Sequence, residues 1–352
     1  MITRDTWVLL VGASGVVGRL TAARLRRRWP DLPILAGGRD LQRAEAVAAD
    51  LGNSRGVAID LSRRDLGLPN DVAVGAIAMF VKDETLNAQL YAQDRGAAFV
   101  EISSAAFEIG PQMAFYVERP HTAPVLLASN WLAGASTFAT LDLASGFARI
   151  DRILVSALLD DHDIGGGAAG ADYVRQTQAG PSGLIRKSGR FTWVAGEDAA
   201  GAFEAVDGTR FDAQVFGNLD VLSLSAATDA PDVAFQFAVG ETSSRRRGEG
   251  FSHEIFIEIA GLSRDGDEVH ARRSVVHPDG QAPMTALCVS LAIESLLGLE
   301  DGKKVAPGLY LPHAVINPAQ GVEALREIGA TIDDIWHPSN SSATPTSERP
   351  AQ

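Results

Sequence analysis

Short apolar runs alternate with longer amphipathic segments over the first 130 residues of the chain. The apolar runs lie at 8–11, 33–36, 56–59, 72–81, 97–102 and 124–128. Their length and scarcity of polar residues are typical of strands buried on both faces of a parallel sheet. Segments of helical length at 16–29, 41–51 and 84–95 lie between them. This alternation predicts a doubly wound parallel α/β domain.

The pattern changes after Asn130. A helix is predicted over 136–148, and further strands are predicted at 152–159, 191–195 and 233–240. Between the first two of these strands lies a glycine-rich segment, predicted as a loop, whose glycines are Gly165, Gly166, Gly167 and Gly170.

A β-hairpin is predicted from 253–262 and 269–276, with Asp265-Gly266 as its turn. In its first arm three isoleucines share one face, whereas Phe256 and two glutamates share the other. This alternation favours a mostly antiparallel sheet with one covered face.

The remaining segments complete a two-domain organisation with a returning C-terminus. The segment 284–297 is apolar nearly all round, which predicts a buried helix, and a last short helix is expected near 320–329. We therefore expect a doubly wound domain at 1–133, an inserted α+β domain at 134–310, a segment at 311–336 that returns to the first domain, and a disordered tail rich in Ser, Thr and Pro at 337–352.

The glycines that follow the first strand indicate a Rossmann dinucleotide-binding fold. Gly12, Gly15 and Gly18 stand between a buried strand and a helix. In such a unit the first glycine makes the turn, the second lets a pyrophosphate approach, and the third packs the helix on the strand. The free N–H groups of the helix N-terminus attract the anion. A purely structural turn is the alternative.

The end of the second strand favours NADP(H) over NAD(H). Sites for NAD usually place a carboxylate there, whereas sites for NADP have a small residue and an arginine. This chain has Gly37, Gly38 and then Arg39, and Asp40 is expected to cap the next helix. Arg39 as an ordinary surface arginine is the alternative reading.

Ligands of doubly wound sheets bind in a crevice at the carboxyl ends of the strands. The residues that follow the other strands are therefore expected to line this crevice. Asp60 and Leu61 follow the third strand and are expected near the adenine. The residues expected farther along the crevice are Phe80, Ser103, Ser104 and Asn130. Helix capping or turn formation would explain the serines equally well.

Composition narrows the function classes. A net charge of −13 and a pI near 5.0 argue against nucleic acid or an anionic membrane as partner. The single cysteine, Cys288, excludes a disulfide framework and a thiolate metal cluster, and no histidine or acidic cluster has metal-ligand spacing. With no segment of signal-peptide or membrane-spanning character, we expect a cytoplasmic protein that acts on a small molecule.

The order of several motifs resembles the saccharopine dehydrogenase-like reductases. The motifs are GASGVVG at 12–18, GGRD at 37–40, FVEISS at 99–104, NWLAGAS at 130–136, GGG at 165–167, GPSGLIRKSGRFTW at 180–193, GNLDVL at 217–222 and PGLYLP at 307–312. The resemblance implies a Rossmann domain, an inserted sheet domain, and reduction or oxidation of a C–N bond.

The resemblance also implies residue roles. The pyrophosphate would lie on Gly12, Ser14, Gly15, Val16, Val17 and Gly18, and the 2′-phosphate on Arg39 beside Gly38. Phe80 and Ser103 would lie near the nicotinamide, beside a loop from Asn130 through Trp131 to Gly134. Two family features are missing: Leu132 replaces an acid, and Ser182 stands where an arginine would bind a substrate carboxylate. A smaller, cyclic or less carboxylated imine is therefore expected instead of saccharopine.

Candidates for catalysis and substrate binding come from the second domain. Tyr173, Asp172 and His162 are the candidates for proton transfer, and Arg175 and Lys187 are candidates for gripping a substrate carboxylate. In addition, Trp131 and Gly134 of the loop beside the nicotinamide are expected to contact the substrate. The alternative for His162 is that the segment 160–163 is simply a solvent-exposed strand end without a catalytic role. We expect an NADPH-dependent imine reductase, and by analogy with the fold a homodimer through the second sheet. A non-redox NADP-binding protein and a C=C or C=O reductase are the alternatives.

Overall fold

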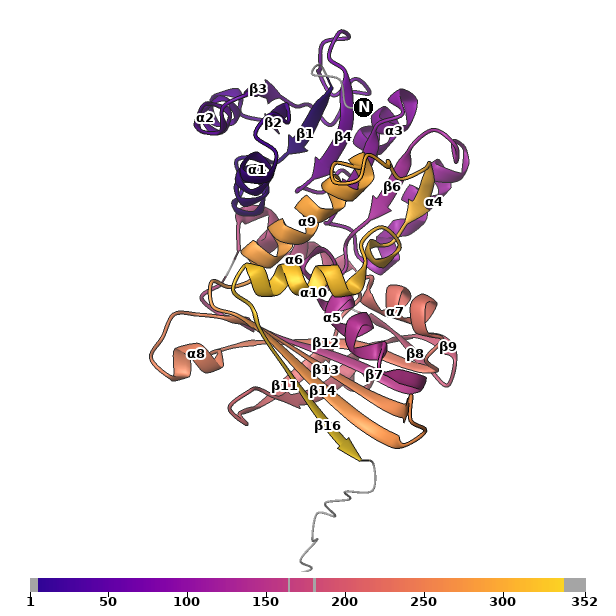
Figure 1. The fold of residues 1–352 in the computed structure, drawn as a ribbon. Coiled ribbons are helices and arrows are strands. Elements are labelled where there is room, and N and C mark those ends of the chain that lie inside the picture. Colours follow the sequence, from indigo (N-terminus) through magenta and orange to yellow (C-terminus); the bar gives the residue numbers. More distant parts are fainter. Residues whose placement is uncertain (1–5, 164, 180–181, 339–352) are drawn as a thin grey trace, which may run out of the picture.

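Two β-sheets with a layer of helices between them make up the computed structural model, which describes residues 6–163, 165–179 and 182–338. Figure 1 shows the first sheet above, the second sheet below, and α5 (Ala135–Ala144), α9 (Ala282–Leu297) and α10 (Pro318–Glu327) between them. The α10 helix packs on both α5 and α9, so these helices join the two sheets.

The first sheet has seven parallel strands in the order β15-β6-β5-β4-β1-β2-β3. Their bounds are β1 (Trp7–Val11), β2 (Ile34–Gly38), β3 (Ser54–Ala58), β4 (Val74–Met79), β5 (Ala98–Glu101), β6 (Pro124–Leu127) and β15 (Gly308–Tyr310). Leu9, Leu10 and Ile77 are completely buried, as expected for strands covered on both faces. The predicted doubly wound parallel sheet is confirmed.

Helices cover this sheet, and the sequence predicted three of them closely. These are α1 (Val16–Arg28), α2 (Leu41–Leu51) and α3 (Asn87–Arg95), and α4 (Ile109–Val117) is an addition. The α9 helix is buried nearly all round and lies on α1, β4 and β5. Burial raises the pKa of its Cys288 thiol to about 12, which disfavours the reactive thiolate. None of the helices in the described part of the chain has the length and apolar character needed to cross a membrane.

The second sheet is mixed and mostly antiparallel, as predicted. Seven strands follow the order β10-β11-β12-β7-β13-β14-β16, and β8 and β9 extend from β12. Their bounds are β7 (Phe147–Asp160), β8 (Gly183–Lys187), β9 (Arg190–Val194), β10 (Ala200–Glu204), β11 (Arg210–Val215), β12 (Asp232–Gly240), β13 (His253–Ser263), β14 (Glu268–His277) and β16 (Thr331–Pro338). The β7–β12 pair is parallel and the other described pairs are antiparallel.

The prediction that only one face of this sheet is covered is wrong at one end, where both faces are covered. The isoleucines of β13 lie on the inner face, against α5, as expected. On the other face, however, Glu254 and Phe256 are also buried. The β10–β11 end of the sheet curls over them, and the rings of Phe203 and Phe256 lie 5.4 Å apart. The curl creates a second small core that strand alternation alone does not predict.

The remaining elements are α6 (Gly167–Ala179), α7 (Asp220–Thr228), α8 (Ser243–Arg246) and short 3₁₀ turns at Ala106–Glu108, Trp131–Gly134, Gly196–Ala199 and Pro312–Ala314. The α6 helix occupies most of the segment that its glycines predicted as a loop, which is a correction. The helix predicted over 136–148 ends at Ala144, because β7 begins at Phe147.

Sheet membership near the C-terminus differs from the expected ranges. The β15 strand and α9 lie on the first sheet, although 134–310 was expected to form the second domain. Conversely, β16 pairs with β14 at the edge of the second sheet, although 311–336 was expected to return to the first domain. His337 and Pro338 belong to this strand, so the predicted disordered tail does not begin at 337; the rest of it lies outside the described residues.

One buried arginine links β14, β16 and α5. The Arg273 guanidinium binds Asp334 at 2.6 and 2.7 Å, Asp142 at 2.7 Å and the Ala139 carbonyl at 2.9 Å. Replacing Arg273 by methionine is expected to lower the free energy of unfolding by about 3 kcal/mol, because two carboxylates lose their cation. Urea unfolding measures this. Arg149→Met, which breaks the exposed pair with Asp151, is the control, with an expected loss below about 1 kcal/mol. Equal losses in the two variants would contradict the role of Arg273.

Candidate functional site

The glycine loop between β1 and α1 has the geometry of a phosphate cradle. Gly12 has a φ of +94°, and a Cβ on Gly18 would lie 2.4 Å from the Gly12 carbonyl oxygen. Gly15, the N-cap residue of α1, offers no capping side chain, and Gly15 and Val16 are exposed. Backbone N–H groups at an exposed helix N-terminus attract anions. The loop therefore fits a pyrophosphate.

Three other residues predicted to bind the cofactor lie in or beside this loop. Ser14 and Val17 are half-buried in the same turn, and Phe80 lies beneath it, with its Cβ 3.2 Å from where a Gly12 side chain would begin. A Cβ on Gly166, just before α6, would lie 3.5 Å from the Val16 side chain. The approach to α6 thus lies against the N-terminus of α1.

The end of β2 has space for a ribose, and an arginine beside this space is available to a phosphate. No atom lies within 4 Å of the position of a Cβ on Gly38, and Arg39 is exposed without a hydrogen bond or ion pair to the described residues. Asp40 caps α2 by accepting from the Arg43 N–H at 3.2 Å, as predicted. Gly38 therefore leaves space for a ligand at this strand end, and the Arg39 guanidinium is available to it.

Asp60 and Leu61 lie at the end of β3, the next strand. Asp60 accepts hydrogen bonds from the backbone and hydroxyl of Ser62, which lower the pKa of its carboxyl group. The Leu61 carbonyl accepts from Thr85 and Asn87, which ties this turn to the start of α3. These contacts fix the wall where the adenine was predicted.

A polar network lies at the carboxyl ends of β4, β5 and β6. The fully buried Glu101 accepts hydrogen bonds from Ser103 N–H at 3.0 Å and from the hydroxyls of Ser104 and Ser129, both at 3.1 Å. Burial raises the pKa of Glu101 despite these bonds. The serines thus bind a buried carboxyl group, and Ser103 also contacts α6 through its carbonyl and its side chain.

Lys82 joins this network and was missed in the sequence. Its Nζ donates to the Ser104 hydroxyl at 2.9 Å and lies 3.4 Å from Glu108. The sequence signal was available, because Lys82 directly follows the apolar strand that ends near Phe80. An ammonium group has three donors, so one N–H direction remains for a ligand.

The α6 helix brings second-domain side chains onto the same strand ends. Arg175 binds Glu108 at 2.9 Å and Asp172 at 2.5 Å, and it also donates to the Ser103 carbonyl. Burial raises the pKa of Asp172 despite this arginine. Arg175 and Asp172 are therefore bound to each other and to the first domain, whereas Tyr173, 47% exposed, faces open space.

The segment from Asn130 to Gly134 is buried between the sheets. Asn130 donates to Thr137 and Ser223, and the Trp131 N–H donates to the buried Asp220 at 2.6 Å. The Trp131 ring lies against Phe235 and Phe237. The backbone is unusual here, because Leu132, Ala133 and Gly134 all have positive φ. The structure thus packs Trp131 and Gly134 into the interface between the sheets.

The indole N–H of Trp131 donates to His253 Nε2 at 2.9 Å. Burial, together with nearby His277, lowers the pKa of His253 to about 3. The folded protein therefore keeps this imidazole neutral at pH values where the unfolded chain, with an ordinary histidine pKa of about 6.5, is protonated.

Stability is therefore expected to fall as the pH drops from about 6.5 towards 3, and His253 contributes about 1.4 kcal/mol per pH unit. His253→Gln keeps an acceptor for Trp131 but does not titrate, so its stability should fall less steeply. Urea unfolding of both proteins at pH 7, 6 and 5 measures the difference. Parallel stability curves would contradict the assignment.

A cleft of about 490 Å³ lies beside these strand ends. Ala105 and Phe107 line it on one side, and Tyr173 and Gln176 of α6 line another. Gln176 also donates to the Ser103 carbonyl at 3.2 Å, so the cleft begins where the nicotinamide is expected. Further walls come from β11 and β12 and from Ser182, where the resemblance implied an arginine.

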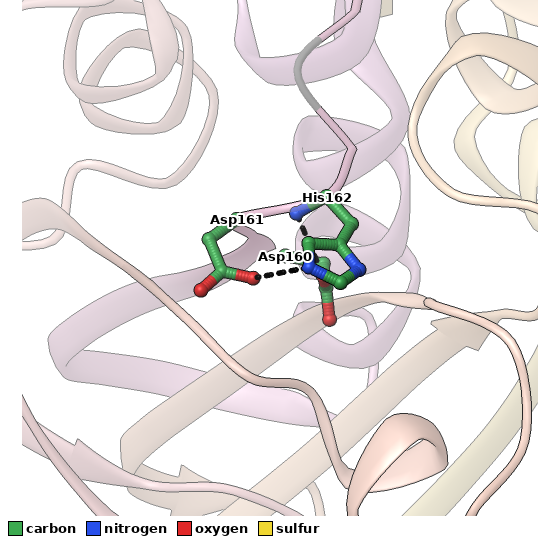
Figure 2. A group of neighbouring side chains, drawn as sticks. All are labelled: Asp160, Asp161 and His162. Atoms are coloured by element: carbon green, nitrogen blue, oxygen red, sulfur yellow. Dashed lines mark hydrogen bonds and ion pairs between the residues drawn. The ribbon is translucent and has the colours of Figure 1, made fainter.

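Two predicted residues lie away from this cleft. His162 is exposed beside Asp160 and Asp161 (Figure 2), and Arg245 binds both carboxylates, at 2.9 and 2.6 Å. The three side chains are close enough to bind a metal, but Arg245 already occupies a position against both carboxylates. Lys187 is exposed at the end of β8 opposite to the cleft.

Comparisons with known proteins bear on the fold. No model of a known protein family matches the sequence, and no curated protein matches it either. Among solved structures, apo saccharopine dehydrogenase (L-Glu forming) from Saccharomyces cerevisiae matches with a TM-score of 0.66 and 13% identity, over 94% of this chain and 100% of that chain. A myo-inositol dehydrogenase from Corynebacterium glutamicum matches with a TM-score of 0.46 and 11% identity, over 92% and 94%. This chain therefore has a saccharopine dehydrogenase-like fold.

Proposed function

We propose that this protein is an NADP(H)-dependent oxidoreductase that acts on a C–N bond, in the direction of imine reduction or its reverse. The observation that carries the proposal is that the three parts of the candidate site lie in a row along one edge of the first sheet. The glycine cradle, the open position at Gly38 with Arg39, and the cleft beyond Ser103 follow one another along the carboxyl ends of the first sheet. A dinucleotide in this crevice would direct its nicotinamide towards the cleft. The fold shared with a saccharopine dehydrogenase supports the same reaction class.

Bound NADPH would supply the hydride. The chain supplies the rest: Gly12 to Gly18 bind the pyrophosphate, Arg39 binds the 2′-phosphate, and Phe80 supports the nicotinamide end. Lys82 donates a proton to the imine nitrogen, which makes the C=N carbon more electrophilic. Glu108 and Ser104 orient the Lys82 ammonium. The α6 helix covers the strand ends and limits water at the reacting atoms.

Reduction of a C=O or C=C bond is a second candidate, and the exposed Tyr173 favours it. The Tyr173 ring lines the cleft, and its hydroxyl group makes no hydrogen bond within the described part of the chain. In that reaction a tyrosine hydroxyl would donate the proton. Tyr173→Phe would then abolish turnover, whereas imine reduction with Lys82 as donor would continue.

The proposal is tested in two steps with the purified protein. Fluorescence titration with NADPH and NADH measures cofactor binding, and NADPH is expected to bind more tightly. Oxidation of NADPH is then followed with cyclic imines, ketones and enones. Turnover of imines supports the proposal, and turnover of ketones or enones alone supports the second candidate. Tight NADPH binding without turnover would indicate a non-redox NADP-binding protein, and binding of neither nucleotide would overturn the proposal.

A further inference from the structure

The cleft beyond Ser103 has an unusual charge pattern for a site that handles small metabolites. Among the described residues that line it, aromatic, aliphatic and uncharged polar side chains prevail, and lysine and arginine are absent. Its single charged lining residue in the described chain is Asp212 of β11. Asp212 is exposed and makes no hydrogen bond or ion pair with described residues.

The basic groups nearest to the cleft are already engaged. Arg175 binds the carboxylates of Glu108 and Asp172 and the Ser103 carbonyl. Lys82 binds Ser104 and Glu108. Neither Arg175 nor Lys82 is among the described residues that line the cleft, so a carboxylate on a ligand there would have no cation beside it and would have the Asp212 charge against it.

The aromatic rings that line the cleft make it suited to a cationic ligand with an apolar body. The Phe216 and Phe237 rings meet edge to face at 5.0 Å, and Tyr173 meets Phe237 in the same way at 6.1 Å. Phe107 lines the same cleft, and it and Tyr173 are the exposed rings of this group. The faces of such rings attract ammonium groups, and a carboxylate at the rim adds to that attraction.

Asp212 and Gln214 are placed to read the polar end of such a ligand. They are two residues apart on β11, so both side chains point to the same face of the strand. Gln214 pairs with Phe237 of β12, which brings the carboxylate, the amide and the aromatic rings together along one wall.

We propose that this cleft binds a cationic amine with an apolar, ring-sized body and no carboxylate, and that Asp212 selects its charge. The assignment of this amine as a reaction partner rests on the proposed reduction of a C–N bond. Binding of the amine to the cleft, in contrast, can be measured without turnover. The amine would be the product of the reduction, and the corresponding imine the substrate.

The test compares two ligands that differ by one carboxylate: 1,2,3,4-tetrahydroisoquinoline and 1,2,3,4-tetrahydroisoquinoline-1-carboxylate. Calorimetric titration measures the binding of each to the full chain, with and without NADP⁺. We expect the amine to bind about tenfold more tightly than the amino acid, because both carry the ammonium that the rings attract, whereas the added carboxylate is repelled by Asp212 and finds no cation in the cleft. Equal binding, or tighter binding of the carboxylated ligand, would overturn the proposal.

Variants identify the residue responsible. Asp212→Asn is expected to weaken binding of the amine about tenfold, and Asp212→Lys to reverse the preference in favour of the carboxylated ligand. Asp265→Asn, in the exposed β13–β14 turn, makes the same charge change away from the cleft and should alter neither affinity. Unchanged binding by Asp212→Asn would reject the role of Asp212, and NADPH titration of each variant confirms that it is folded.

The outcomes separate this proposal from the proposed function. If the amine binds with the expected preference but no imine oxidises NADPH, the cleft assignment stands and the reductase assignment fails. If imines that carry a carboxylate are the ones reduced, the reductase assignment stands and the charge selection fails.

Discussion

Replacing Arg39 by alanine is expected to weaken NADPH binding by about 10- to 100-fold, because a hydrogen-bonded charge contact to a phosphate contributes about 1.5–3 kcal/mol. Binding of NADH should remain within about twofold, since NADH has no 2′-phosphate for the guanidinium to bind. Arg39 is exposed and forms no contact that its loss would disrupt in the described structure. Fluorescence titrations of both nucleotides measure the two affinities.

Arg55→Ala is the matched control for this experiment. Arg55 is an exposed arginine near the amino end of β3, whereas Arg39 follows the carboxyl end of the neighbouring β2. The two variants lose the same charge from the same domain. A selective loss of NADPH affinity in Arg39→Ala alone assigns the 2′-phosphate site, and equal losses in both variants would show a general charge effect instead.

Replacing Lys82 by methionine is expected to lower kcat for imine reduction by about 10²- to 10⁴-fold, the usual range for loss of a positioned proton donor. The affinity for NADPH should change far less, because the Lys82 ammonium group contacts Ser104 and Glu108, neither of which belongs to the glycine loop. Steady-state kinetics with a cyclic imine, together with NADPH titration, separate the two effects.

Lys187→Met serves as the control, because Lys187 is exposed at the far end of β8 and should be replaceable with less than about a twofold change in rate. A purely structural role of Lys82 would lower thermal stability and NADPH binding together with kcat. A rate within about fivefold of wild type would reject Lys82 as the proton donor. In that case Tyr173→Phe becomes the decisive variant.

The sequence predicted the features whose physics is local. The spacing of Gly12, Gly15 and Gly18 after an apolar strand predicted the cradle, since each glycine is required by a contact within a few residues. Asp40 was predicted as a helix cap because capping needs only the next three residues. The apolar runs predicted six strands of the first sheet, and the Asp265-Gly266 turn predicted the hairpin.

Tertiary contacts decided elements whose local sequence was ambiguous or misleading. The four glycines from 165 to 170 favour a loop, yet α6 starts at Gly167, and its Arg175 and Gln176 side chains bind Glu108 and the Ser103 carbonyl. Such contacts compensate for the low helix propensity of glycine. The three-residue β15 is too short to recognise, because its hydrogen bonds come from β6.

The sequence by itself thus determined the Rossmann-type sheet and the glycine loop after its first strand, and it offered the arginine that we propose selects NADP(H). Only the tertiary structure brought Lys82, Ser104, Glu108 and Arg175 into one network, because they come from three separate segments of the chain. It also placed Asp212 beside the aromatic wall, through the pairing of β11 with β12. Local spacing determines backbone geometry over one or two turns, whereas the chemistry of a cleft depends on which distant strand ends the fold brings together.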